Sequence, residues 1–238
     1  MTDASSATLD LREIGVRDVG VSNLTAGGAA LSLGSLGVTA TSVLYALSPP
    51  AAALPAQPFD QASAVAGAIA GARTMFAAGT VGIFSDIVMA VGAMRVALEL
   101  SRRGRGLAVA GWAAMLLSIV IFTLVDAIVG YVLSPVAAMA DGAGAFAGFK
   151  RLFDVLFLLG TTAFGAGAML GLTSEIQSSA PIMGKPVALA GALTGLAAVL
   201  AAGASFAGFP LEQGVGISIG LGSAIFVAIG VQIMLKPQ

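Results

Sequence analysis

The fold is decided by residues 73–126, which read RTMFAAGTVGIFSDIVMAVGAMRVALELSRRGRGLAVAGWAAMLLSIVIFTLVD. Two apolar runs, one holding Asp86 and one ending at Asp126, are joined by the basic turn 101–106 (SRRGRG). As a helix, each run is long enough to cross the hydrocarbon core of a bilayer, which is about 30 Å thick. The stretch therefore predicts a helical hairpin in a membrane.

The composition of the whole chain agrees with this hairpin. Of its 238 residues, 58% are hydrophobic and only 10% are charged, and the mean hydropathy is +0.99. Soluble domains are about 45–50% apolar and about 25% charged. We predict an all-α, polytopic transmembrane helix bundle whose main partner is the lipid bilayer. The net charge of −1 gives no basic footprint for nucleic acid.

The residues that are missing exclude several kinds of chemistry. The chain has no cysteine and no histidine, which rules out disulfides, thiolate metal sites, histidine-ligated haem and histidine-based acid–base catalysis. Phosphate-binding loops, serine-hydrolase elbows, zinc-protease motifs and dinucleotide fingerprints do not occur. The aspartates lack the Gly-x-Gly-Asp context of intramembrane aspartyl proteases. We expect no enzymatic activity, no cofactor and no metal site.

Hydropathy divides the chain into a polar segment, residues 1–25, and a transmembrane domain, residues 26–238. We expect no signal peptide in the polar segment. The predicted spans are 26–47, 75–98, 107–133, 152–172, 187–207 and 215–235. The densest positive cluster is formed by Arg102, Arg103 and Arg105. The positive-inside rule places this turn, and with it both termini, in the cytoplasm.

The connections between spans carry their own expectations. Residues 49–58 contain four prolines and predict a semi-rigid loop. Residues 61–76 fit either a short interfacial helix or an extension of the second span. We expect residues 134–149 to form an outer loop rich in glycine and alanine, and residues 173–186 to form a polar inner loop.

Several charges lie far from the basic turn. Asp86 is 16 residues before Arg102, or roughly 24 Å along a helix, inside the hydrocarbon core. Asp126 is 21 residues after Arg105, or roughly 31 Å, near the outer boundary. Asp154 lies about one turn into the fourth span. The cations expected at the same level are Arg73, Lys150 and Arg151.

Two interpretations of this charged layer stay open. Gly79, Gly82 and Asp86 share one helix face, and small, polar faces of membrane helices normally meet other helices. The layer is then a polar cavity that binds a cation or carries protons, with Asp86 as its main group and Asp126 and Asp154 beside it. Alternatively, it is a structural set of ion pairs, in which Asp154 pairs locally with Lys150 and Arg151, four and three residues before it on one helix.

Part of the chain resembles a known family. The similar stretches are Arg73 with residues 82–90 (GIFSDIVMA) and the basic turn, Phe164-Gly165, residues 181–185 (PIMGK) and residues 191–196 (GALTGL). From Arg73 onward the chain resembles a bacterial family of six-helix integral membrane proteins of unknown function. The resemblance implies a six-helix architecture and a location in the bacterial inner membrane, and it implies no activity.

Two functions follow as expectations. The first is an accessory or structural subunit that packs against other membrane proteins. The second is a small transporter or channel, linked to a cation or proton, that uses the carboxylates around Asp86. Three small-xxx-small motifs are expected to pack helices within one subunit. These motifs are Gly167-xxx-Gly171, Gly191-xxx-Gly195 and Gly216-xxx-Gly220.

Overall fold

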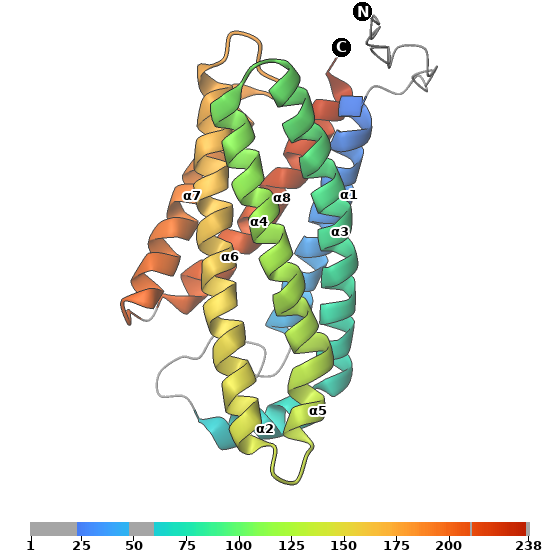
Figure 1. Cartoon of the computed structure of the whole chain (residues 1–238), viewed down its shortest axis with the longest axis vertical. Coiled ribbons are helices and arrows are strands. Elements are labelled where there is room, and N and C mark those ends of the chain that lie inside the picture. The colour runs from blue at the N-terminus through green and yellow to red at the C-terminus, as the bar shows by residue number, and fades with distance from the viewer. Residues whose placement is uncertain (1–22, 48–59, 210, 237–238) are drawn as a thin grey trace, which may run out of the picture.

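The computed structural model describes residues 23–47, 60–209 and 211–236, which are helical apart from short connections (Figure 1). The helices are α1 (Asn23–Ala46), α2 (Gln61–Ala70), α3 (Ala72–Arg102), α4 (Gly106–Ile128), a π-helical turn η2 (Val129–Leu133), α5 (Ser134–Ala137), α6 (Ala143–Gln177), α7 (Lys185–Phe206) and α8 (Glu212–Leu235). Six segments are long and apolar enough to cross a membrane. The predicted all-α, six-span fold is confirmed. The proline-rich loop, residues 49–58, and most of the polar segment, residues 1–25, lie outside the described residues.

The six long helices form a closed ring. Along it, α1 packs against α3, α3 against α4, α4 against α6, α6 against α7, α7 against α8, and α8 against α1. The α3–α4 turn, the α6–α7 loop, the start of α1 and the end of α8 lie together at the top of Figure 1. We call this the basic end, and the opposite end, which carries α2 and α5, the far end. The first and last spans thus begin and end on the side of the basic turn.

Glycines set the close crossings in this ring. A Cβ added at Gly79 of α3 lies 2.6 Å from the Cα of Gly130, and one added at Gly111 of α4 lies 2.6 Å from the Cα of Gly171. Backbones that approach this closely leave no space for a larger residue, and small residues hold membrane helices together in this way.

The three small-xxx-small motifs differ in what they contact. Gly171 lies against Gly111 of α4, and Gly195 lies against Gly165 of α6. In the described part of the chain, a Cβ at Gly216 or Gly220 meets no atom within 4 Å. The expectation of packing within the subunit is therefore wrong for the motif on α8, because no described residue packs against these two glycines.

The far end is more helical than predicted. The expected outer loop, residues 134–149, consists of α5, a short turn and the first residues of α6. Pro135 cannot donate a hydrogen bond to the preceding turn, and the helix widens into the π-turn η2 immediately before it. Phe146 of α6 is fully buried against Leu133 and Val129. This packing holds a glycine- and alanine-rich segment in a helix, which local composition did not indicate.

The segment 61–76 is divided at Gly71. Helix α2 ends there and α3 begins at the next residue, so the segment contains a separate short helix and the first turn of the second span. Asp60 caps α2 by accepting hydrogen bonds from Ala62 N, at 3.1 Å, and from Ser63 Oγ. The hydrogen bond from Ser63 holds the pKa of Asp60 below its usual value. Helix α2 packs against α5.

Candidate functional site

Asp86 projects from α3 into the ring and is 4% exposed. The small residues Gly79 and Gly82 share its face and are also buried, as the spacing predicted. Thr123 Oγ1 of α4 lies 3.2 Å from Asp86 Oδ2 and 2.9 Å from the carbonyl oxygen of Ile119. Since a hydroxyl carries one proton, Thr123 divides it between the carboxyl group and its own helix.

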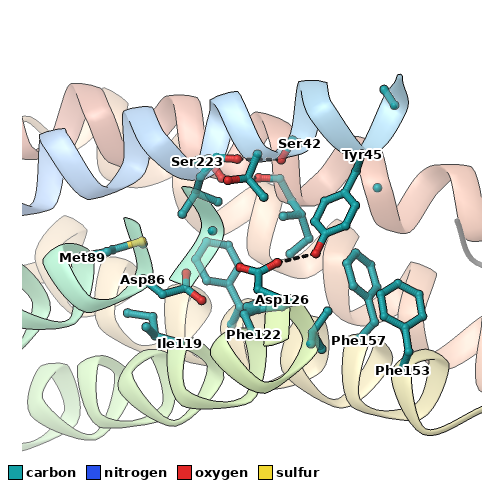
Figure 2. A pocket seen from close by; sticks show the side chains of 18 of the residues that line it. Ser42, Tyr45, Asp86, Met89, Ile119, Phe122, Asp126, Phe153, Phe157 and Ser223 are labelled. Atoms are coloured by element: carbon teal, nitrogen blue, oxygen red, sulfur yellow. Dashed lines mark hydrogen bonds between the residues drawn. The ribbon is translucent and has the colours of Figure 1, made fainter. Parts of the chain in front are cut away.

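Asp126 projects from α4 toward the same place and is 5% exposed. Tyr45 Oη, near the end of α1, donates a hydrogen bond to Asp126 Oδ1 (Figure 2). The other carboxyl oxygen fills the notch left by Gly82, where an added Cβ lies 1.9 Å from it. Gly82 is one helical turn before Asp86. The two carboxyl groups therefore lie beside each other in one compartment, as the cavity interpretation expected, although the residue count alone put Asp126 near the outer boundary.

Both carboxyl groups line a cavity of about 570 Å³. It lies between an apolar cluster toward the basic end, which includes Trp112, and a second one toward the far end, which includes Phe146. Its aromatic wall consists of Phe122, Phe153, Phe157 and Phe164. The hydroxyl groups opposite belong to Thr41, Ser42 and Ser223, and each donates to a carbonyl oxygen of its own helix. The cavity is thus apolar except at the two carboxyl groups and a few hydroxyls (Figure 2).

The exposed lining residues mark where the cavity opens. Ala46 ends α1, and Gly216 and Ile217 lie in the first turns of α8. All three are exposed, and Ile217 is 68% exposed. Because α1 and α8 are neighbours in the ring, the opening lies between two membrane helices. It faces sideways, near the far end of both.

The cations that the sequence offered as partners lie elsewhere. Arg73 and Arg151 are exposed, and within the described ranges neither forms an ion pair with Asp86 or Asp126. Arg73 is 13 residues before Asp86, which is a rotation of roughly 220° around a helix. The two side chains therefore leave α3 in nearly opposite directions. An ion-pair layer joining α3, α4 and α6 at this level is not formed by the described residues.

Asp154 belongs to a separate pair. Lys150, one turn before it on α6, donates a hydrogen bond to Asp154 Oδ1. The ammonium group lies 4.7 Å from the centre of the Phe153 ring, and Lys150 is 1% exposed. Of the two local partners expected from the sequence, Lys150 pairs with Asp154, whereas Arg151 is exposed and forms no ion pair with it among the described residues. Asp154 does not line the cavity.

The basic end holds a different kind of buried acid. Glu175 is fully buried, and its Oε1 forms an ion pair of 2.6 Å with Nη1 of Arg105. Its Oε2 accepts a hydrogen bond from Ile182 N at 2.8 Å. Arg105 Nη2 also donates to the carbonyl oxygen of Ser174 at 2.9 Å. These contacts join the α3–α4 turn to the end of α6, where the sequence predicted only a polar loop.

Sequence reasoning missed three of these roles. Tyr45 ends the predicted first span, where a tyrosine suits the membrane interface, and no sequence pattern linked it to Asp126, although it is one of only two tyrosines in the chain. Lys150 was expected just before the fourth span and Glu175 in the polar inner loop 173–186, yet both are buried. Their burial depends on how α6 extends beyond the predicted span 152–172, which no local pattern showed.

The donor set limits what the cavity can hold. Hard divalent cations take six or more oxygen ligands. The described residues contain no group of three or more acidic side chains that could hold a metal. Two carboxyl groups, one phenol and one threonine hydroxyl can instead accept protons or the cationic group of an organic molecule. Membrane carboxyl groups without cationic partners commonly have such roles.

Comparisons with protein-family models, with curated proteins and with solved structures find no match. The structure itself identifies the class of the protein: its six long apolar helices are those of a multi-pass integral membrane protein.

Proposed function

We propose that this protein is a small carrier in a bacterial inner membrane that binds a cation or protons between Asp86 and Asp126. The observation that supports the proposal is the set of groups that surround these two acids. Both are nearly buried, and their hydrogen-bond partners in the described structure are the neutral hydroxyls of Thr123 and Tyr45. Two negative charges in an apolar cavity are costly, so binding a proton or a cation relieves that cost.

The arrangement of the ring fits a carrier with access from one side. The cavity opens toward the far end, beside Ala46 and Gly216. The basic end is filled by an apolar cluster that includes Trp112 and is closed by Arg105 and Glu175. By the positive-inside rule the basic end faces the cytoplasm. The proposed resting state is therefore open outward and closed inward.

Proton exchange in liposomes tests the proposal. The full chain is reconstituted with a pH indicator inside, and a cation gradient of Na⁺, K⁺ or ethidium is imposed, each in turn. We expect one of these gradients to drive proton movement in the wild type and not in Asp86→Asn or Asp126→Asn. Asp141→Asn is the matched control, because Asp141 is an exposed acid in the turn before α6. Equal proton movement in all four proteins, or none above empty liposomes, contradicts the proposal.

An accessory subunit is the second candidate function, and one observation favours it. Gly216 and Gly220 leave a small-residue face of α8 uncovered by the described chain, and such faces join helices of different subunits. Purification of the native protein in mild detergent is the test. A protein that copurifies with the wild type and is lost with Gly220→Leu supports this role, and purification of the chain alone contradicts it.

A further inference from the structure

The cavity between the two carboxyl groups and the aromatic wall is larger than a proton or a bare metal ion requires. Its volume of about 570 Å³ lies within the range of small-molecule sites, roughly 300–1,000 Å³. A small inorganic cation bound there would leave most of this space against apolar side chains. The volume therefore favours a ligand that has a sizeable apolar part as well as a charged group.

The walls indicate the chemistry of that body. Phe122 and Phe157 meet edge to face with centroids 5.6 Å apart, and Phe153 stacks obliquely on Phe157 at 5.8 Å. Aromatic rings arranged in this way present faces and edges to an apolar or aromatic guest, and their faces also attract cations. Opposite them, Ile219 and Val38 continue the apolar lining.

The position of the opening indicates how the ligand arrives. It lies between the end of α1 and the start of α8, which are both membrane spans. An amphipathic molecule concentrates at the boundary between headgroups and acyl chains, which is the level where these spans end. A lateral opening there admits molecules from the lipid.

We infer that the ligand of this cavity is an amphipathic organic monocation that enters from the far-side leaflet between α1 and α8. Its charged group lies between Asp86 and Asp126, and its apolar body lies against Phe122, Phe157 and Phe164. Tyr45 is a positioning residue that holds Asp126 toward the cavity through its hydrogen bond. The inference rests on the proposed function and narrows it to one substrate class.

Protons compete with this cation for the same carboxyl groups. Within the described ranges, the titratable side chains of the lining are Asp86 from α3, Asp126 from α4 and Tyr45 from α1, while α6 and α8 contribute apolar and hydroxyl groups. On α6, which supplies part of the aromatic wall, Lys150 and Asp154 form an ion pair with each other. Acidification is therefore expected to weaken cation binding.

The test uses the full chain in detergent and a pair of ions of the same shape. Tetraphenylphosphonium is positive and tetraphenylborate is negative, so comparing them distinguishes the effect of ligand charge from the effect of ligand size. Binding of each ion is measured by titration calorimetry. We expect tetraphenylphosphonium to bind and tetraphenylborate not to bind, and we expect a hundredfold excess of Na⁺ not to displace the bound cation. The affinity of Asp86→Asn and of Asp126→Asn for tetraphenylphosphonium is expected to be lower by a factor of about 30 or more. The Asp141→Asn control keeps wild-type affinity, and the elution profile and thermal unfolding of each variant check its folding.

A second pair of variants tests the opening. Gly216 lines the cavity, and Gly220, one turn further along α8, does not. Both have open space around an added Cβ, so Gly216→Leu and Gly220→Leu are matched in their effect on packing. We expect only Gly216→Leu to slow tetraphenylphosphonium binding, and equal rates for both variants overturn the assignment of the opening.

The outcomes separate this inference from the proposed function. If Na⁺ or K⁺ drives proton movement that depends on Asp86, but tetraphenylphosphonium does not bind, the organic-cation inference fails and the carrier remains. If tetraphenylborate binds as well as tetraphenylphosphonium, the inference also fails. If neither proton movement nor binding depends on the two aspartates, both proposals fail.

Discussion

Glu175 at the basic end and Asp86 at the level of the cavity are both buried acids, yet their surroundings differ. Glu175 has a guanidinium group at 2.6 Å and a backbone donor at 2.8 Å. Among the described residues, Asp86 has a single shared hydroxyl at 3.2 Å, a second acid nearby and an apolar cavity. The comparison teaches that burial by itself does not identify a functional acid in this protein. The partner does: a matched cation makes Glu175 a structural link, whereas no described cation pairs with Asp86, and this difference is the basis for proposing Asp86 as part of a binding site.

The largest expected effect comes from removing the cation of the matched pair. Arg105→Ala leaves the buried Glu175 without its counter-charge, which typically costs about 3–5 kcal/mol. Thermal unfolding in detergent measures this loss, and cation binding by the folded fraction is expected to persist. Arg102→Ala is the control, since Arg102 is 65% exposed and its ion pair with Glu99 is 3.8 Å long. Exposed pairs contribute about 0–1 kcal/mol, so an equal loss in both variants would contradict the comparison.

The next effect concerns the notch that holds Asp126. In Gly82→Ala, the new methyl group lies 1.9 Å from Asp126 Oδ2 and forces the carboxyl group to move. Overpacking of this kind costs about 1–3 kcal/mol, and loss of tetraphenylphosphonium binding is expected with it. Gly203→Ala has open space around the added methyl and is expected to be neutral or slightly stabilising. Undiminished binding by Gly82→Ala would show that the position of Asp126 does not matter.

At Asp86, in contrast to Arg105, a substitution is not expected to destabilise the protein. Asp86→Asn removes an acid that pairs with no cation in the described part of the chain, so the free energy of unfolding is expected to stay unchanged or to rise by up to about 2 kcal/mol, as at other functional sites. Glu175→Gln, its counterpart at the basic end, is expected to lower it. Thermal unfolding of the two variants side by side checks the signs. A clear destabilisation by Asp86→Asn would make Asp86 structural.

A smaller effect is expected at Tyr45. Tyr45→Phe keeps the ring and removes the hydrogen bond to Asp126, which is worth about 0.5–1.5 kcal/mol. As a positioning residue, Tyr45 should change the pH dependence of cation binding more than stability. Titration calorimetry at several pH values measures this change, and a pH profile identical to the wild type would remove Tyr45 from the site.

The smallest effect concerns an exposed acid outside the spans. The pKa of Asp60 is lowered in the folded chain by its hydrogen bond from Ser63, so its contribution is complete above the unfolded pKa, about 3.9. It is lost as the pH falls through the lower, folded pKa. Amide exchange at the start of α2 should therefore quicken in acid. Asp60→Ala should remove this dependence and leave the cavity unchanged.

The sequence alone determined the membrane class, the six spans and the inward direction of Asp86. These features depend on local composition and helical spacing, and Gly79, Gly82 and Asp86 already share one face in the printed chain. Helical spacing could also have shown that Arg73 and Asp86 point in nearly opposite directions and do not pair, because 13 residues turn a helix by roughly 220°. The tertiary structure alone decided that Asp126 lies beside Asp86, that Tyr45 reaches it from α1, and that Glu175 is held by Arg105. These contacts join helices that are distant in the chain. The closed ring of six helices determines which helix faces meet, and no single segment of the sequence encodes that ring.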